Sequence, residues 1–148
     1  MSLGLVYLSR GLDGGLLATK AFFSAYCDHP AGCPHELIVI MKGWFGVNGE
    51  DEIRQLAKTH SATVIDLPDD GFDWGAYMRV APLLKHDFVC FCNTHSRPLV
   101  DGWLDLLKKS AESDSINIGA VGATASYQGC IPPFPWPPLR KKVALSGV

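Results

Sequence analysis

Polar residues capable of binding a ligand follow an apolar run late in the first hundred positions of this chain. Phe88–Cys92 leads directly into Asn93, Thr94, His95 and Ser96. Asn93 and His95 are two residues apart, so their side chains point the same way if the extended geometry continues. An amide oxygen and an imidazole placed together can bind a divalent metal ion or a diphosphate. The alternative interpretation is an Asx turn with a surface histidine.

Three earlier apolar runs are also followed by polar, turn-forming residues. Ser9 and Arg10 follow the first run, Lys42 the second, and the segment 68–75, which contains Asp73, the third. Arg10 either faces a phosphate group or lies in solvent. The glycines after Arg10 match neither G-x-G-x-x-G nor G-x-x-x-x-G-K-[ST], which argues against a Rossmann dinucleotide site and a P-loop. The sequence also contains no H-E-x-x-H motif and no Ser/His/Asp nucleophile set.

A second group of chemically active residues lies between positions 27 and 35. Cys27, His29, Cys33 and His35 are all zinc-ligand types. Their C-x-H-x3-C-x-H spacing is not that of a usual zinc finger or ribbon. We therefore favour an ordinary loop between a helix and a strand, with a structural zinc site as the alternative.

The apolar pattern predicts the scaffold that positions these residues. Five short apolar runs are nearly continuous rather than alternating, as in strands covered on both faces: 3–8, 37–41, 63–67, 88–92 and 118–123. Cys90 and Cys92 share one face of the fourth run and are expected to be small buried residues. Helical spacing appears between the runs, around 18–25, 53–60, 77–84 and 100–107, with expected N-caps at Asn48, at Asp73, and at Ser96 or Asp101.

Alternating strands and helices predict an α/β domain with a largely parallel sheet and helices on both faces. In such sheets, ligands bind beyond the carboxyl ends of the strands, where the strand order reverses. The polar residues after each run are therefore expected to converge. A cleft of this kind requires the first and fourth strands to be neighbours.

Composition excludes several classes of protein. The 148 residues suit one domain, with 47% hydrophobic and 19% charged residues. Thirteen basic and fifteen acidic residues give a net charge of −2, which argues against a nucleic-acid partner. No apolar run approaches the length of a membrane span, and the N-terminus lacks signal-peptide features. The odd count of five cysteines favours a reducing, cytoplasmic location.

The C-terminal residues 129–148 differ from the rest and are predicted to form a proline-rich arm. Five of the ten prolines lie between Pro132 and Pro138. Proline lacks an amide donor and has a fixed φ, so an extended, polyproline-like chain is expected. We expect Phe134 and Trp136 to pack against the domain. The alternative is a ligand for a proline-binding module.

Three segments together resemble a known family: Gly71–Ala81 (GFDWGAYMRVA), Asp87–Ser96 (DFVCFCNTHS) and Gly119–Ser126 (GAVGATAS). They are similar to the nucleotide-binding half of GT-A-fold glycosyltransferases, specifically the family 2-like, rhamnan-synthesis-type enzymes. The resemblance implies that residues 1–128 form a three-layer domain like that of nucleotide-diphospho-sugar transferases. It covers roughly residues 3–128, and the combination of motifs is more specific than any one of them.

The resemblance also implies roles for individual residues. Those predicted to bind the nucleotide-sugar are Ser9, Arg10, Lys42, Asp73, Gly75, Tyr77, Asn93 and Ser96. Asn93 and His95 would occupy the place of the family's Asp-x-Asp, which holds Mn²⁺ or Mg²⁺ against the diphosphate. This chain has no carboxylate there, so metal binding is weakened or replaced by arginine and histidine contacts. No catalytic residue is assigned.

The function predicted from the resemblance is that of a hexosyltransferase-like glycosyltransferase in polysaccharide biosynthesis. It would bind a nucleotide-diphospho-sugar donor and transfer the sugar to a glycan or another acceptor. The chain stops at Val148, before the segment that supplies acceptor recognition in the family, which suggests a truncated copy. One alternative is a catalytically eroded GT-A-like domain that acts as a binding or interaction module. Another is a different small α/β enzyme that uses His95 as a general acid or base.

Overall fold

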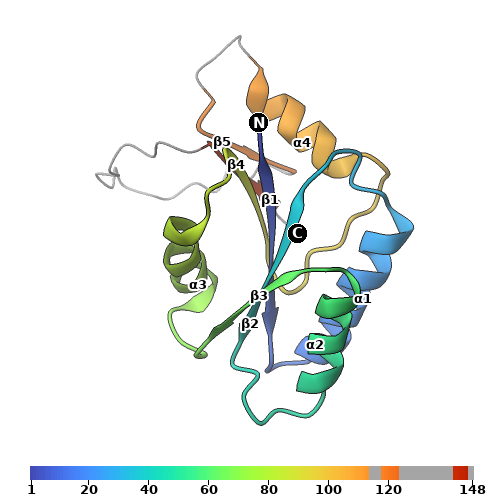
Figure 1. The fold of residues 1–148 in the computed structure, drawn as a ribbon, viewed down its shortest axis with the longest axis vertical. Coiled ribbons are helices and arrows are strands. Elements are labelled where there is room, and N and C mark those ends of the chain that lie inside the picture. The colour runs from blue at the N-terminus through green and yellow to red at the C-terminus, as the bar shows by residue number, and fades with distance from the viewer. Residues whose placement is uncertain (114–117, 124–141, 147–148) are drawn as a thin grey trace.

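The computed structural model describes residues 1–113, 118–123 and 142–146 of the chain. A six-stranded sheet lies at its centre, with the strand order β3-β2-β1-β4-β6-β5. All the strand pairs are parallel (Figure 1). The strands are β1 (Leu3–Arg10), β2 (Glu36–Lys42), β3 (Thr63–Leu67), β4 (Phe88–Cys92), β5 (Ala120–Gly122) and β6 (Lys142–Ser146). The first five correspond to the five predicted apolar runs, with β5 shorter than expected.

Helices cover both faces of the sheet, as predicted. They are α1 (Gly15–Asp28), α2 (Glu50–Thr59), α3 (Phe72–Val80) and α4 (Trp103–Glu112), with a short 3₁₀ helix η1 (Ala81–Leu83) after α3. In Figure 1, α1, α2 and α4 lie on one side of the sheet and α3 lies on the other. The α/β class, the parallel sheet and the two covered faces are therefore confirmed.

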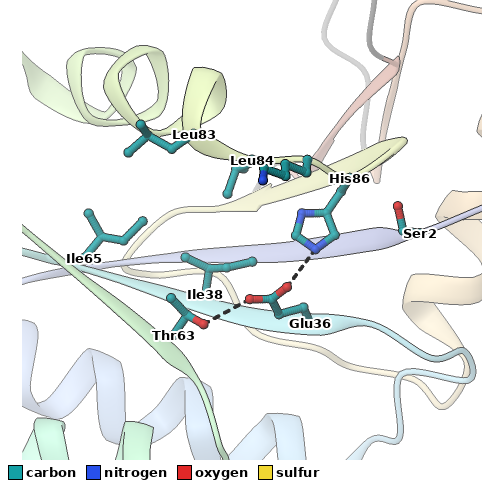
Figure 2. A pocket seen from close by; sticks show the side chains of 9 residues that line it. Ser2, Glu36, Ile38, Thr63, Ile65, Leu83, Leu84 and His86 are labelled. Atoms are coloured by element: carbon teal, nitrogen blue, oxygen red, sulfur yellow. Dashed lines mark hydrogen bonds and ion pairs between the residues drawn. The ribbon is translucent and has the colours of Figure 1, made fainter.

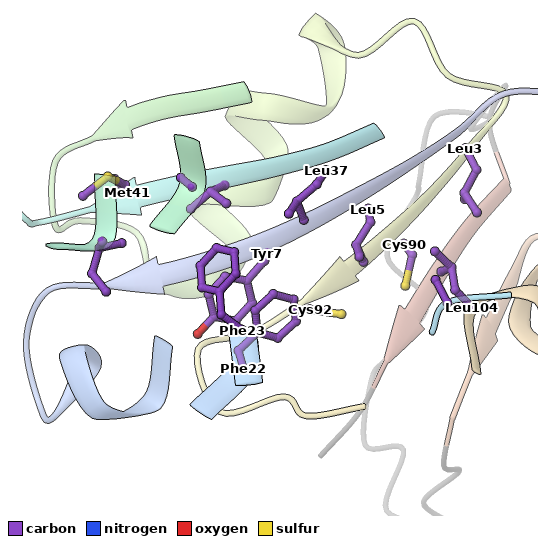
Figure 3. Close-up of a cluster of buried hydrophobic side chains, with 14 of the residues drawn as sticks. Leu3, Leu5, Tyr7, Phe22, Phe23, Leu37, Met41, Cys90, Cys92 and Leu104 are labelled. Carbon is purple, nitrogen blue, oxygen red and sulfur yellow. The ribbon is translucent and has the colours of Figure 1, made fainter. Parts of the chain in front are cut away.

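Aromatic packing dominates the face that α1, α2 and α4 cover (Figure 3). The ring of Tyr7 on β1 stacks on that of Phe22 on α1, with centroids 3.7 Å apart. Phe23 meets both rings edge-on. Cys90 and Cys92 lie in the same cluster, as predicted, and a hydrogen bond between the two thiols together with burial raises the pKa of Cys90.

The opposite face is aliphatic and is covered by α3. Val6 and Leu8 of β1 and Ile38 and Ile40 of β2 pack there against Val80 and its helical neighbours. Successive side chains of a strand point to opposite faces, so each central strand must be apolar at every position to fill two cores. This requirement explains the nearly continuous apolar runs in the sequence.

The predicted helix caps are wrong. All four helices begin after a glycine in the left-handed conformation, with no side-chain cap hydrogen bond: Gly14, Gly49, Gly71 and Gly102. Glycine adopts positive φ without steric cost, so a sharp turn into the helix replaces the side-chain cap. Asn48 and Asp101 precede these glycines, Asp73 lies in the first turn of α3, and the Ser96 hydroxyl bonds Asn93 instead.

The predicted C-terminal arm contains a strand that the sequence analysis did not foresee. Lys142–Ser146 forms β6, which pairs in parallel with β4 on one side and β5 on the other. The rest of the arm, including Phe134 and Trp136, lies outside the described residues.

Removing the Phe22 ring should destabilise the fold strongly. Phe22 is fully buried and stacks on Tyr7, so Phe22→Ala should lower the free energy of unfolding by about 3–5 kcal/mol, measured by urea denaturation. Leu17→Ala is the matched control on the same helix, because Leu17 is 74% exposed. Equal losses for both variants would contradict the described packing.

Candidate functional site

The strand order places a reversal point between β1 and β4. From β1, the chain adds β2 and then β3 on one side, whereas β4 pairs with the other side of β1. The last register pair between the two strands is Tyr7 with Cys92. The strands separate after this pair, and the crevice between them begins at Leu8 and Asn93. The first and fourth strands are thus neighbours, which is the condition set above for a ligand cleft at their carboxyl ends.

The loop after β4 is fastened to the end of β1. The Thr94 hydroxyl donates to the Leu8 carbonyl at 2.9 Å, and the Tyr7 hydroxyl donates to the Thr94 carbonyl at 2.9 Å. Burial raises the pKa of Tyr7 far above its usual value, so its hydroxyl remains a donor. These two bonds fix the backbone from which the neighbouring side chains reach the crevice.

Asn93 forms the Asx turn that we considered as the alternative. Its Oδ1 accepts hydrogen bonds from the His95 amide and the Ser96 hydroxyl, both at 3.0 Å. Ser96 is buried, and its Oγ also accepts a hydrogen bond from the Asn93 amide at 3.1 Å. The side chains of His95 and Arg97 are exposed at the end of the turn. The turn therefore serves to present these two side chains.

The residues at this turn do not suit a resident Mn²⁺ or Mg²⁺ ion. The oxygen of Asn93 is engaged within the turn, and the segment offers no carboxylate, the ligand that these hard cations favour. Within residues 1–113, 118–123 and 142–146, no three His, Cys, Asp or Glu side chains are grouped as metal ligands. An anion here has to be bound by cationic side chains and amides.

Ser9 lies inside the protein rather than on the crevice surface. Its Oγ lies 2.7 Å from the Thr19 hydroxyl of α1 and accepts a hydrogen bond from the Trp44 indole at 2.9 Å. The Trp44 indole also contacts the Ser9 carbonyl at 3.0 Å. Ser9 therefore ties β1 to α1 and to the loop after β2, and its role is structural in this conformation.

Arg10 and Lys42 are both engaged by the loop after β3. The Arg10 guanidinium binds Asp69 through two hydrogen bonds of 2.9 Å and contacts Asp13 at 2.6 Å. The Lys42 ammonium is buried, donates to the Phe72 carbonyl at 2.8 Å and lies 3.6 Å from Asp69. Arg10 above all, with Lys42, lowers the pKa of Asp69 below its ordinary 3.8. Two cations and two carboxylates thus form a network without net charge.

This network holds the turn between β3 and α3 in a strained conformation. Phe72 has a φ of 51°, in the left-handed region that non-glycine residues rarely adopt. The bond from Lys42 to its carbonyl compensates for that strain. A further pair, Arg79 with Asp70 at 2.6 Å, holds the same turn against α3 and lowers the pKa of Asp70.

The three predicted residues on α3, Asp73, Gly75 and Tyr77, are all half-buried. Tyr77 packs on Phe91 of β4 with ring centroids 4.6 Å apart, and burial followed by the charge of Asp73 raises its pKa. Gly75 donates its amide to the Gly71 carbonyl at 2.7 Å, within the first turn of the helix. Asp73 lies one turn before Tyr77, in the first turn of the helix, and its side chain is half-buried.

Cavities open on both sides of the crevice along the carboxyl edge of the sheet. One of about 520 Å³ lies at the ends of β2 and β3, against Trp44, Phe45 and Asp69. Another of about 750 Å³ lies between α4 and β5 and is reached from His95 and Arg97. Sequence reasoning placed Asp69 and Arg97 just beyond strand ends without assigning either a role, and it did not name Phe45.

A further cavity, of about 490 Å³, lies at the amino ends of the strands (Figure 2). Glu36, the first residue of β2, accepts a hydrogen bond from the Thr63 hydroxyl at 3.0 Å and contacts His86 Nε2 at 3.0 Å. Among the described residues, His86 Nδ1 has no hydrogen-bond partner; it is buried and would meet a Cβ placed on Gly4. This cavity is at the opposite end of the sheet from the crevice.

The cysteine and histidine residues between positions 27 and 35 do not form a zinc site. Their contacts lead in different directions: Cys27 to His60 at 3.8 Å, His29 to Asp101 at 3.2 Å, and His35 to Tyr26 at 2.7 Å. The segment is a connection between α1 and β2, as we favoured from the spacing.

No family model, curated protein or solved structure matches this chain. The resemblance to GT-A glycosyltransferases therefore stays a prediction from sequence motifs. Across the described residues, no helix has the length and apolar character needed to cross a membrane. The fold and the geometry of the crevice are the observations on which a function has to be argued.

Acidification should lower the stability of the domain through the Asp69 network. Because Arg10 above all, with Lys42, lowers the pKa of Asp69 in the folded state, the stability that this carboxylate contributes is present above its ordinary pKa of 3.8 and is lost as the pH falls through its lowered pKa. Urea denaturation between pH 7 and pH 3 should show this loss as a fall in the free energy of unfolding. In the Asp69→Asn variant the free energy of unfolding should depend less steeply on pH. Asp51→Asn, on the exposed start of α2, should keep the wild-type slope. An unchanged slope in Asp69→Asn would exclude this role.

Proposed function

We propose that this domain binds a nucleotide-diphospho-sugar along the carboxyl edge of its sheet and transfers the sugar to an acceptor. The observation that carries the proposal is the β1–β4 reversal point, with exposed His95 and Arg97 at the end of β4. A crevice at this place in a parallel sheet is a common ligand site. The motif resemblance to GT-A glycosyltransferases supports the choice of ligand.

The nucleoside is assigned to the cavity of about 520 Å³ beside β2 and β3. Phe45 is 99% exposed at its rim, which suits stacking on a base. The carboxylates of Asp69 and Asp13 are held in place by Arg10 and keep acceptor positions for ribose hydroxyls. A volume of this size is within the usual range for small-molecule sites.

The diphosphate is assigned to the end of β4. His95 and Arg97 are exposed there, and no ion pair neutralises Arg97 within the described parts of the chain. Arg10 and Lys42, which we predicted to contact the nucleotide directly, are held by carboxylates and a backbone carbonyl. In the proposal they position the loop after β3, while Arg97 supplies the free positive charge.

The proposed setting is polysaccharide or surface-glycan synthesis on the cytoplasmic side. The described cysteines Cys27, Cys33, Cys90 and Cys92 are free thiols, which supports a reducing compartment. The second candidate function is a catalytically eroded domain that acts as a binding module. The Asx turn at Asn93, in the place of the family's Asp-x-Asp, favours it.

A thermal-shift titration separates the two functions. The chain is titrated with UDP, GDP, dTDP and their sugars, with and without Mn²⁺. A ligand at a hundredfold its dissociation constant adds about 2.7 kcal/mol of stability, a rise of several degrees in Tm for a domain of this size. One nucleotide should raise Tm without needing Mn²⁺. Unchanged Tm with every nucleotide would favour the eroded binding module.

Phe45→Ala should lower the affinity for the nucleotide that raises Tm by about tenfold, because base–aromatic stacking contributes about 1–3 kcal/mol per base. Phe45 is almost fully exposed, so the variant should unfold at the wild-type Tm without ligand. Leu17→Ala, another exposed apolar residue but on α1, is the matched control and should bind as the wild type does. Equal affinity for the Phe45→Ala variant would remove the nucleoside from this cavity.

A further inference from the structure

A large apolar groove adjoins the crevice on the side away from the nucleoside cavity. We call it the α4–β5 groove; its volume is about 750 Å³, and it is lined by the segment after β4, one face of α4 and the strand β5. Leu99, Val100 and Leu106 line it and are each more than half exposed. Exposed apolar side chains that gather around one concave surface mark a binding site more often than scattered ones do.

The mouth of the groove is polar and cationic. His95, Ser96 and Arg97 line the end nearest β4, so the groove opens beside the proposed diphosphate position. Asp101 and Asp105, the acidic residues nearest along the chain, contact His29 and Lys109 respectively. Arg97 thus faces the mouth as a cation, while most of the remaining side chains that line the groove are apolar.

An apolar groove with a cation at its mouth complements an anionic amphiphile. We propose that the α4–β5 groove binds a single-chain amphiphile with a phosphate-monoester head, the phosphate at Arg97 and the hydrocarbon chain along Leu99 and Leu106. Binding an isolated phosphate would leave the groove unused, and a neutral hydrocarbon would leave the cation without a partner. The amphiphile satisfies both parts of the surface.

Trp103 provides a direct reporter of binding because it lines the groove. The full chain is titrated, below the micelle concentration, with octyl phosphate carrying a terminal bromine, a contact quencher of indole fluorescence. Quenching should saturate, and Trp103→Phe should abolish the saturable part. Brominated octanol should bind at least tenfold more weakly, and inorganic phosphate should need at least a tenfold higher concentration to displace the brominated octyl phosphate and restore the fluorescence. These measurements need no nucleotide, so they test the groove separately from the proposed donor site.

Paired variants locate the two parts of the ligand. Arg97→Gln should weaken binding of the brominated octyl phosphate about tenfold and leave brominated octanol unaffected, whereas Lys58→Gln on α2 should change neither. Leu99→Ser should weaken both ligands several-fold. Leu83→Ser is its control, because Leu83 is similarly exposed but lies at the amino-end cavity. All four side chains are at the surface, so the variants should fold.

Three results would overturn the proposal. The first is an absence of saturable quenching, and the second is equal binding of octyl phosphate and inorganic phosphate. The third is a wild-type dimer in sedimentation that Leu99→Ser converts to monomer, which would make the groove an interface between two copies. If the alkyl phosphate binds but no nucleotide raises Tm, the groove stands and the proposed transfer fails.

Discussion

The parallel pairing of β1 with β4 sets the geometry of the carboxyl edge of the sheet. It places the reversal of strand order at one point of the carboxyl edge, and it brings the loop after β4 against the end of β1. The bonds between Thr94 and Leu8 and between Tyr7 and Thr94 then fix that loop. Because both strands are buried on both faces, the edge they form is rigid, and rigidity is what a preorganised ligand site requires.

Polar groups just below this edge are used to join elements rather than to bind ligands. Ser9, Thr19 and Trp44 satisfy one another in the interior, where an unpaired donor or acceptor would cost about 1–3 kcal/mol. Lys42 does the same for the turn at Phe72. The surface that remains for a ligand is therefore built from the next residues outward, chiefly Phe45 beside β2 and His95 and Arg97 beyond β4. The edge of the sheet thus has three consecutive regions: the cavity beside β2 and β3, a cationic crevice and an apolar groove.

The local sequence predicted the central strands well and the helix starts poorly. Strands covered on both faces must be apolar at every position, so runs such as Leu37–Met41 are unmistakable. A helix start depends on a single backbone conformation, and the nearest polar residue is an unreliable guide to it. At α3 the left-handed Gly71 makes the turn, and Asp73, the expected cap, lies within the helix. The strand β6 was missed because it follows a proline-rich stretch, and its pairing with β4 and β5 is entirely non-local.

The α/β class, the identity of the central strands and the polar character of each strand end could be predicted from the residues alone, because these follow from hydrophobic patterning and local turn chemistry. Which polar residues remain available was decided only by the tertiary structure. Arg10 resembles a phosphate ligand in the sequence, yet Asp69, fifty-nine residues later in the chain, binds its guanidinium at two points. Arg97 remains exposed at the mouth of a groove that three separate segments create. The difference arises because the availability of a charge depends on its partners in space, and parallel connections bring those partners from far along the chain.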